Sequence, residues 1–169
     1  DQTLLDETVR GFLADQIPID RIRALRDEDC PIDRSIWKSI AELGMTGVLV
    51  PEAQGGNDIS LLDASIVAQA LGHAVTPTPF LSSSIIATVA LKSIDHPKTA
   101  DWRSGIASGE QIVGTAFMEL FGRREEAGVS VASGKLNGKA MMALDACPAD
   151  LILVAIDSST LAMVRRDAK

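Results

Sequence analysis

Residues 43–56 read LGMTGVLVPEAQGG, and this stretch decides the fold. Its apolar run stops at Pro51 and is followed by Gly55 and Gly56, residue types that break helices and strands. The stretch therefore predicts an ordered, irregular loop over residues 44–60 between two regular elements.

The helix after this loop has a marked start and a marked end. Ser60 stands three residues before Asp63, which is the pattern of a capping box. Residues 61–75 are apolar on nearly every side, so we expect a buried central helix. Pro77 and Pro79 end it, because proline has no N–H to donate and pushes the preceding residue out of helical conformation.

Helical periodicity extends over the first half of the chain. Leu5, Val9 and Phe12 recur at helical spacing, and so do Ile36 and Ile40. The predicted helices cover residues 5–13, 19–26, 36–43, 61–75, 81–94 and 99–108.

After Gly109 the pattern changes to short strands, with Ser133-Gly134 and residues 157–159 as hairpin turns. The expected strands are residues 112–117, 129–132, 136–142, 151–156 and 161–164. Helices first and strands afterwards predict an α+β fold. We expect an N-terminal all-α helical domain over residues 1–109 and part of a β-domain over residues 110–169. If the chain ends at Lys169, its last strand leaves an open edge, which predicts an oligomer or a longer polypeptide.

The composition favours a folded, soluble protein and excludes several functions. The chain has 169 residues, 46% of them hydrophobic, enough to bury a core. Its formal net charge is -7 and it has no basic stripe, so no nucleic acid is expected. No run approaches the roughly 18 apolar residues of a membrane span. The first residues also lack an export signal, so we predict a cytoplasmic location without membrane contact.

Residue spacing alone reveals no catalytic or metal site. His73 and His96 have no carboxylate or thiol at metal-ligand spacing, so no metal is predicted. The serines at residues 82–84 lack a G-x-S-x-G elbow and are not a predicted nucleophile. Cys30 and Cys147 lie far apart and form no C-x-x-C pair, so buried free thiols in a reducing cytoplasm are expected.

Stretches along nearly the whole chain resemble one protein family. They are residues 43–56, 69–80, 106–111 and 136–151, in the family's order. They resemble the signature loop, the next helix and its exit, the helical-to-β junction, and the middle of the β-domain of the acyl-CoA dehydrogenase family. Such agreement over several stretches is more specific than any one motif.

The resemblance implies a reaction and a cofactor. Members of this family dehydrogenate acyl-CoA thioesters: a glutamate removes the α-proton, and the flavin of FAD accepts a hydride from the β-carbon. The family's glutamate lies in a later C-terminal helical domain, which is absent here, so no catalytic residue is expected in this segment. The resemblance also implies an acyl-CoA substrate and a homo- or hetero-oligomer with another such subunit. Fatty-acid and sterol side-chain thioesters both remain open.

The resemblance also places the flavin ring against two segments of the β-domain. The predicted cofactor-binding residues are Phe117, Met118, Glu119, Met142, Ala143 and Leu144. The family commonly has Thr-Glu-Pro where this chain has Met-Glu-Leu, and an aromatic and a hydroxyl residue at Met142 and Leu144. A thioether is at best a weak hydrogen-bond acceptor, so only backbone donors near Phe117 and Ala143 remain. Core packing is the alternative interpretation of both methionines.

Three hypotheses follow. The favoured one is part of a working FAD-dependent acyl-CoA dehydrogenase. The alternative is a non-catalytic structural partner subunit of a hetero-oligomeric acyl-CoA dehydrogenase, indicated by the losses at Met118, Met142 and Leu144. A helical interaction module without a cofactor would leave the resemblance of the strands unexplained.

Overall fold

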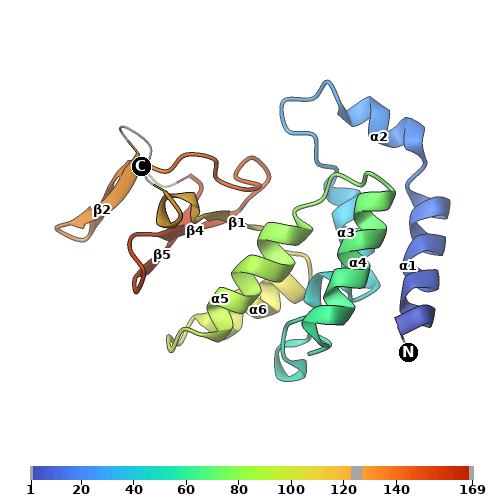
Figure 1. Ribbon diagram of the computed structural model, residues 1–169, viewed down its shortest axis with the longest axis horizontal. Helices are drawn as coiled ribbons and strands as arrows, with labels where there is room; N and C mark the ends of the chain where they lie inside the picture. The colour runs from blue at the N-terminus through green and yellow to red at the C-terminus, as the bar shows by residue number, and fades with distance from the viewer. Residues whose placement is uncertain (1, 123–126, 168–169) are drawn as a thin grey trace.

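The computed structural model describes residues 2–122 and 127–167, and it has the α+β fold expected from the sequence. The helices come first and the strands follow, and Figure 1 shows them side by side. The α-helices are α1 (Gln2–Gln16), α2 (Ile19–Leu25), α3 (Arg34–Glu42), α4 (Leu61–His73), α5 (Thr88–Lys92) and α6 (Thr99–Ala107). Short 3₁₀ turns cover Met45–Gly47, Glu52–Gln54 and Met118–Leu120.

The main hydrophobic core lies between α1, α3 and α4. Val9 of α1, Trp37 and Ile40 of α3 and Val67 of α4 are all buried in it. In contrast, α2 buries none of its residues, and Figure 1 shows it projecting from the other helices. The chain between α2 and α3 therefore returns to the molecule from an exposed position.

The start of α4 confirms the capping box, but its burial differs from the prediction. The Ser60 hydroxyl accepts from the Asp63 N–H while the Asp63 carboxylate accepts from the Ser60 N–H. The expectation of a helix buried on nearly every side is wrong, because Leu61 and Leu62 are each 62% exposed. Only the face that packs on α1 and the core is covered.

The loop over residues 44–60 is ordered, as expected. Its backbone folds back on itself, with the Asp58 N–H donating to the Val50 carbonyl at 2.9 Å. The Thr46 hydroxyl donates to the carbonyl of Ala107 at the end of α6, at 2.7 Å. Gly56 lies so close to Val50 that any side chain would overlap the carbonyl. This loop therefore fixes α6 to the entry of α4.

Where one helix was predicted over residues 81–94, the structure has two consecutive helices of different types. A π-helix covers Phe80–Ala87 and passes directly into α5. Its serines at 82–84 are fully buried, and the Ser83 hydroxyl accepts from the N–H of Val113 at 3.1 Å. A π-turn is wider than an α-turn, and it brings this hydroxyl to the first strand. The π-helix thus joins the helices to the sheet.

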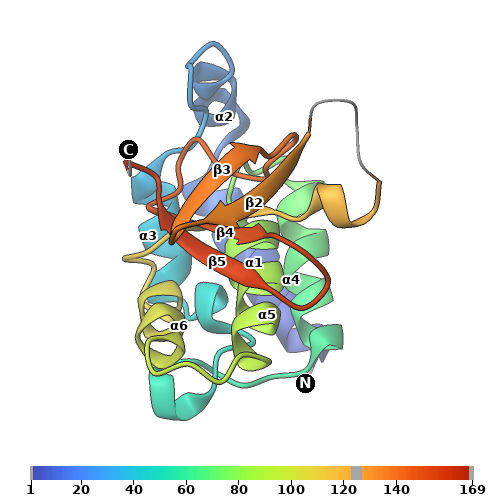
Figure 2. The same ribbon diagram turned by 90° about the vertical axis from the view of Figure 1, so that its left-hand side faces the viewer.

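The strands form a mixed sheet and a separate hairpin. Strands β1 (Val113–Ala116), β4 (Leu151–Ala155) and β5 (Leu161–Arg165) lie in the order β1-β4-β5, with β1 parallel to β4 and β5 antiparallel to it. Figure 2 shows these strands over one side of the helices.

The hairpin consists of β2 (Gly128–Ala132) and β3 (Lys135–Lys139). Ser133 and Gly134 make its turn with φ of 52° and 74°, the left-handed conformation that a type I′ turn needs. The predicted strand 136–142 is wrong at its end, because β3 stops at Lys139 and Met142 has φ of 54°, outside strand conformation.

The expectation of buried free thiols is wrong. Cys30 and Cys147 form a disulfide with their Cα atoms 5.8 Å apart. Cys147 is exposed and Cys30 is partly buried. The fold brings together two loops separated by 117 residues, a proximity that spacing along the chain does not reveal.

Candidate cofactor-facing site

The predicted flavin-facing residues lie on two segments that the fold brings together. One is the end of β1 with the 3₁₀ turn Met118–Leu120 after it, and the other is residues 141–145 before β4. Leu144 pairs with Thr115 of β1 in antiparallel fashion, through N–H to carbonyl bonds of 2.8 and 3.1 Å. Antiparallel pairing places residues near 142 beside residues near 117. Contact of these residues with a cofactor stays a prediction.

A glycine allows this close approach. A Cβ at Gly114 would lie 3.0 Å from the Leu144 carbonyl oxygen and 3.2 Å from that of Asp145. Both are backbone atoms, so a side chain at this position would push the segment away from β1. Met142 and Asp145 have positive φ of 54° and 50°, which bends the segment on either side of its contact with the strand.

The predicted residues are exposed to different degrees. Met118, Met142 and Leu144 are 40%, 55% and 38% exposed. Phe117 packs against a second hydrophobic cluster, which is smaller than the main core and lies between the sheet and the helices. Ala143 lines an open pocket of about 300 Å³ between the hairpin and the three-stranded sheet. Glu119 lies in the 3₁₀ turn.

Two further apolar residues, one in the turn and one directly after it, are also exposed and were missed from the sequence. Leu120 is 44% and Phe121 83% exposed. Only the path of the chain after β1 reveals them, because a single apolar residue in a loop has no pattern that separates surface from core. We use the name methionine surface for these two residues together with Met118, Met142 and Leu144, the exposed apolar residues of the two segments.

The methionine surface has little chemistry of its own. Its side chains are thioethers, alkyl groups and one phenyl ring, none of which carries a proton to transfer. Elsewhere in residues 2–122 and 127–167, no group of three or more His, Cys, Asp and Glu side chains is placed to hold a metal ion. Over the same residues, no helix has the length and apolar character to cross a membrane.

The segment before β4 is anchored by Asp150. Its carboxylate accepts from the N–H of Ile112 at 2.9 Å and from the guanidinium of Arg34, on α3, at 2.7 Å. Arg34 also donates to the carbonyl of Pro148 at 2.8 Å. The segment that carries Met142 and Leu144 is therefore held at one end by β1 and at the other by α3.

Comparison with known proteins identifies the family. Residues 1–110 match the model of the acyl-CoA dehydrogenase N-terminal domain. The chain belongs to the acyl-CoA dehydrogenase family. The acyl-CoA dehydrogenase IpdE2 of Mycolicibacterium smegmatis is 32% identical over 122 residues, which are 72% of this chain and 38% of that protein. IpdE2 of Mycobacterium tuberculosis is 29% identical over 139 residues, 80% of this chain and 43% of that protein.

Solved structures of acyl-CoA dehydrogenases have the same fold. A variant of the Tcur3481-Tcur3483 steroid ACAD superposes with a TM-score of 0.83 at 24% identity, over 99% of this chain and 48% of that chain. The ChsE4-ChsE5 complex of Mycobacterium tuberculosis gives a TM-score of 0.81 at 24% identity, over 98% of this chain and 47% of that chain. The chain thus spans less than half the length of these acyl-CoA dehydrogenase relatives.

The side chains of the methionine surface do not fit the flavin ring that the family implies. An isoalloxazine has ring nitrogens and carbonyl oxygens that need hydrogen-bond donors, and Met118, Met142 and Leu144 have none to offer. The backbone N–H and carbonyl of Leu144 are both engaged by Thr115. Apolar surface remains for packing, but polar recognition of a flavin by these side chains is lost.

Proposed function

We propose that this chain is the N-terminal part of a supporting subunit in a two-component, FAD-dependent acyl-CoA dehydrogenase. The complete enzyme would carry out α,β-dehydrogenation of an acyl-CoA thioester. The observation that carries the proposal is the methionine surface, where three positions expected to face the flavin are the apolar residues Met118, Met142 and Leu144. Membership of the family supports the reaction class. The methionine surface supports the assignment of this chain to a subunit that does not itself hold the flavin.

The division of roles has a physical reason. Binding a flavin buries its polar ring atoms, and each buried polar atom without a partner costs about 1–3 kcal/mol. A subunit with hydroxyl and aromatic residues at these positions recovers that cost through hydrogen bonds and stacking. A subunit with Met and Leu at these positions does not recover it. FAD, when held by the partner subunit, would supply the hydride acceptor, while this chain would supply packing surface.

The test is the visible absorption spectrum of the full-length gene product, purified alone and after co-expression with the product of its genomic neighbour. We expect no flavin bands from the lone subunit and clear bands from the co-purified complex, with one FAD per pair of unlike subunits. Flavin bound in equal amount to the lone subunit would contradict the supporting role and favour a catalytic subunit. Absence of flavin from both samples would contradict a flavoenzyme.

A double variant makes this test more specific. Met118→Ala combined with Met142→Ala removes both thioethers from the surface. If the partner subunit holds the flavin, the FAD content per complex stays unchanged in this variant. A fall in FAD content without loss of the complex would mean that these methionines contact the flavin. Leu81→Ala, at a 55% exposed residue of the π-helix, is the matched control for loss of exposed apolar surface.

A further inference from the structure

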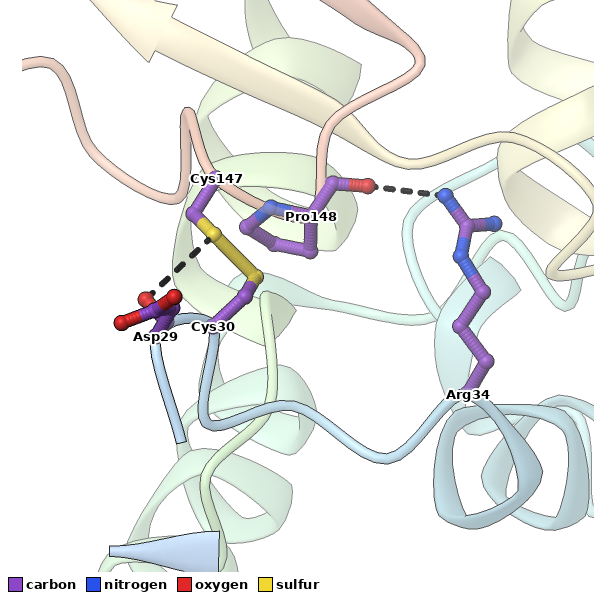
Figure 3. Close-up of a disulfide and its surroundings, with 5 residues drawn as sticks. All are labelled: Asp29, Cys30, Arg34, Cys147 and Pro148. Atoms are coloured by element: carbon purple, nitrogen blue, oxygen red, sulfur yellow. Dashed lines mark hydrogen bonds between the residues drawn. A yellow bond between two sulfur atoms is a disulfide. The ribbon is translucent and has the colours of Figure 1, made fainter. Parts of the chain in front are cut away.

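The disulfide between Cys30 and Cys147 connects the helical part of the chain to the β part. Cys30 lies in the loop between α2 and α3, and Cys147 lies in the segment before β4. Figure 3 shows the two side chains meeting between these loops, beside Pro148. A bond at this place spans the boundary between the helices and the sheet, and it closes a loop of 117 residues.

The two residues of the disulfide lie outside the hydrophobic core. Cys147 is exposed and Cys30 is only partly buried, in contrast to the fully buried residues of the neighbouring core. Thiol–disulfide exchange requires a thiolate to approach one sulfur along the S–S axis, so access governs its rate. A core disulfide would be protected from exchange, whereas this one joins an exposed residue to a partly buried one.

The other tethers between the two loops are weak by themselves. Arg34 donates to the Pro148 carbonyl and pairs with Asp150, and in Figure 3 it reaches across from α3. The side chains of this ion pair are 54% and 39% exposed, and pairs in such positions contribute little to stability. The disulfide is therefore the covalent connection between the two parts, and it adds to the packing of the buried Ala149 in the main core and to the bonds between Asp150 and Ile112.

We propose that the Cys30–Cys147 disulfide is a redox-controlled clasp that fixes the segment of residues 141–150 on the helical part of the chain. Oxidised, it holds this segment and the exposed Met142 in one position. Reduced, it leaves the segment held by Arg34, by the bonds of Asp150 to Ile112, by the buried Ala149 and by the pairing of Leu144 with β1. The clasp does not depend on which subunit carries a flavin.

The exchange partner is a dithiol, either a small molecule or a protein with a redox-active cysteine pair. One thiolate of the dithiol attacks the sulfur of Cys147, which forms a mixed disulfide and releases Cys30 as a thiolate. The second thiol of the reductant then displaces Cys147. Two electrons pass to the cysteine pair, each cysteine ends with one proton, and the reductant becomes a disulfide. The reverse sequence with an oxidised dithiol closes the clasp.

The test measures backbone hydrogen exchange in the full-length protein before and after treatment with dithiothreitol. We expect peptides covering residues 141–150 to exchange about tenfold faster after reduction, while peptides of α1 and α4 stay unchanged. Mass spectrometry of the same samples follows the linked peptide that contains Cys30 and Cys147. Unchanged exchange after complete reduction would overturn the clasp, and so would failure of the linked peptide to form with oxidised glutathione.

Matched variants separate the disulfide from its neighbours. In Cys30→Ser with Cys147→Ser, residues 141–150 should exchange at the fast rate with or without dithiothreitol. In Arg34→Gln, which keeps both cysteines, the response to dithiothreitol should persist and become larger, because the second tether is gone. A response to dithiothreitol in the double serine variant would assign the effect to other groups and overturn the proposal.

Discussion

Asp33 shows how one side chain can start a helix and connect two elements. It is the N-cap of α3, and its carboxylate accepts from the N–H groups of Ser35 and Ile36. It also forms an ion pair with Arg21 of α2. Loss of such a cap costs about 1 kcal/mol. We therefore expect Asp33→Ala to lower the melting temperature of the full-length protein, measured by calorimetry.

The charge on Asp33 makes this stabilisation depend on pH. Burial acts to raise the pKa of Asp33, but hydrogen bonds from Ser35 and the ion pair with Arg21 outweigh it, and the pKa falls from 3.8 to about 2. The unfolded chain therefore takes up the proton first as the pH falls. The stabilisation is complete above the unfolded pKa and is lost as the pH falls from about 4 to about 2.

Asp33→Asn is the control for this effect, because Asn caps helices about as well as Asp but carries no charge. The difference in unfolding free energy between the wild type and this variant should shrink over the acidic window. A difference that stays constant down to pH 2 would show that the charge contributes nothing.

At the scale of elements, the loop over residues 44–60 depends on Gly56. A methyl group there would overlap the Val50 carbonyl, which also accepts the Asp58 N–H. The Val50 carbonyl is part of the backbone and cannot rotate out of the way as a side chain can. The loop would therefore have to open. Overpacking of this kind costs about 1–3 kcal/mol. We expect Gly56→Ala to lower the melting temperature and to weaken the contact between this loop and α6.

Gly72→Ala is the opposite case on the adjoining helix. Gly72 is exposed on α4, and an added Cβ would meet no atom within 4 Å. Alanine favours a helix interior over glycine by about 1 kcal/mol and the last turn, where Gly72 lies, by less, so this variant should raise the melting temperature slightly. If both glycine variants shifted the melting temperature in the same direction, the steric explanation for Gly56 would be wrong.

Elements with local chemical signals were predicted well from the sequence. The capping box of Ser60 and Asp63 and the turn at Ser133-Gly134 are formed by neighbouring residues, so the sequence contains them in full. The π-helix Phe80–Ala87 was missed because its width is set by distant contacts. Ser83, for example, accepts a hydrogen bond from β1, 30 residues along the chain.

At the scale of the whole molecule, the order of helices and strands was predictable, while the pairing of distant loops was not. The disulfide depends on the return of the chain from α2 toward β4, which no local pattern encodes. The candidate site was located through family resemblance, which named Met118 and Met142. The exposure of Leu120 and Phe121 beside them follows only from the path of the chain after β1.

Asp150 gives a prediction about how the helices and the sheet stay together. The exposed Arg34 donates to both of its oxygens, and one of them also accepts from the N–H of Ile112, a fully buried residue. Asp150→Ala removes both contacts and leaves a backbone donor without its partner, which costs about 1–3 kcal/mol. Asp150→Asn keeps an oxygen for Ile112 and loses the charge, a change worth at most about 1 kcal/mol at an exposed pair. Denaturant unfolding of both variants should therefore show the larger loss for alanine, and equal losses would mean that Arg34, rather than Ile112, is the important partner.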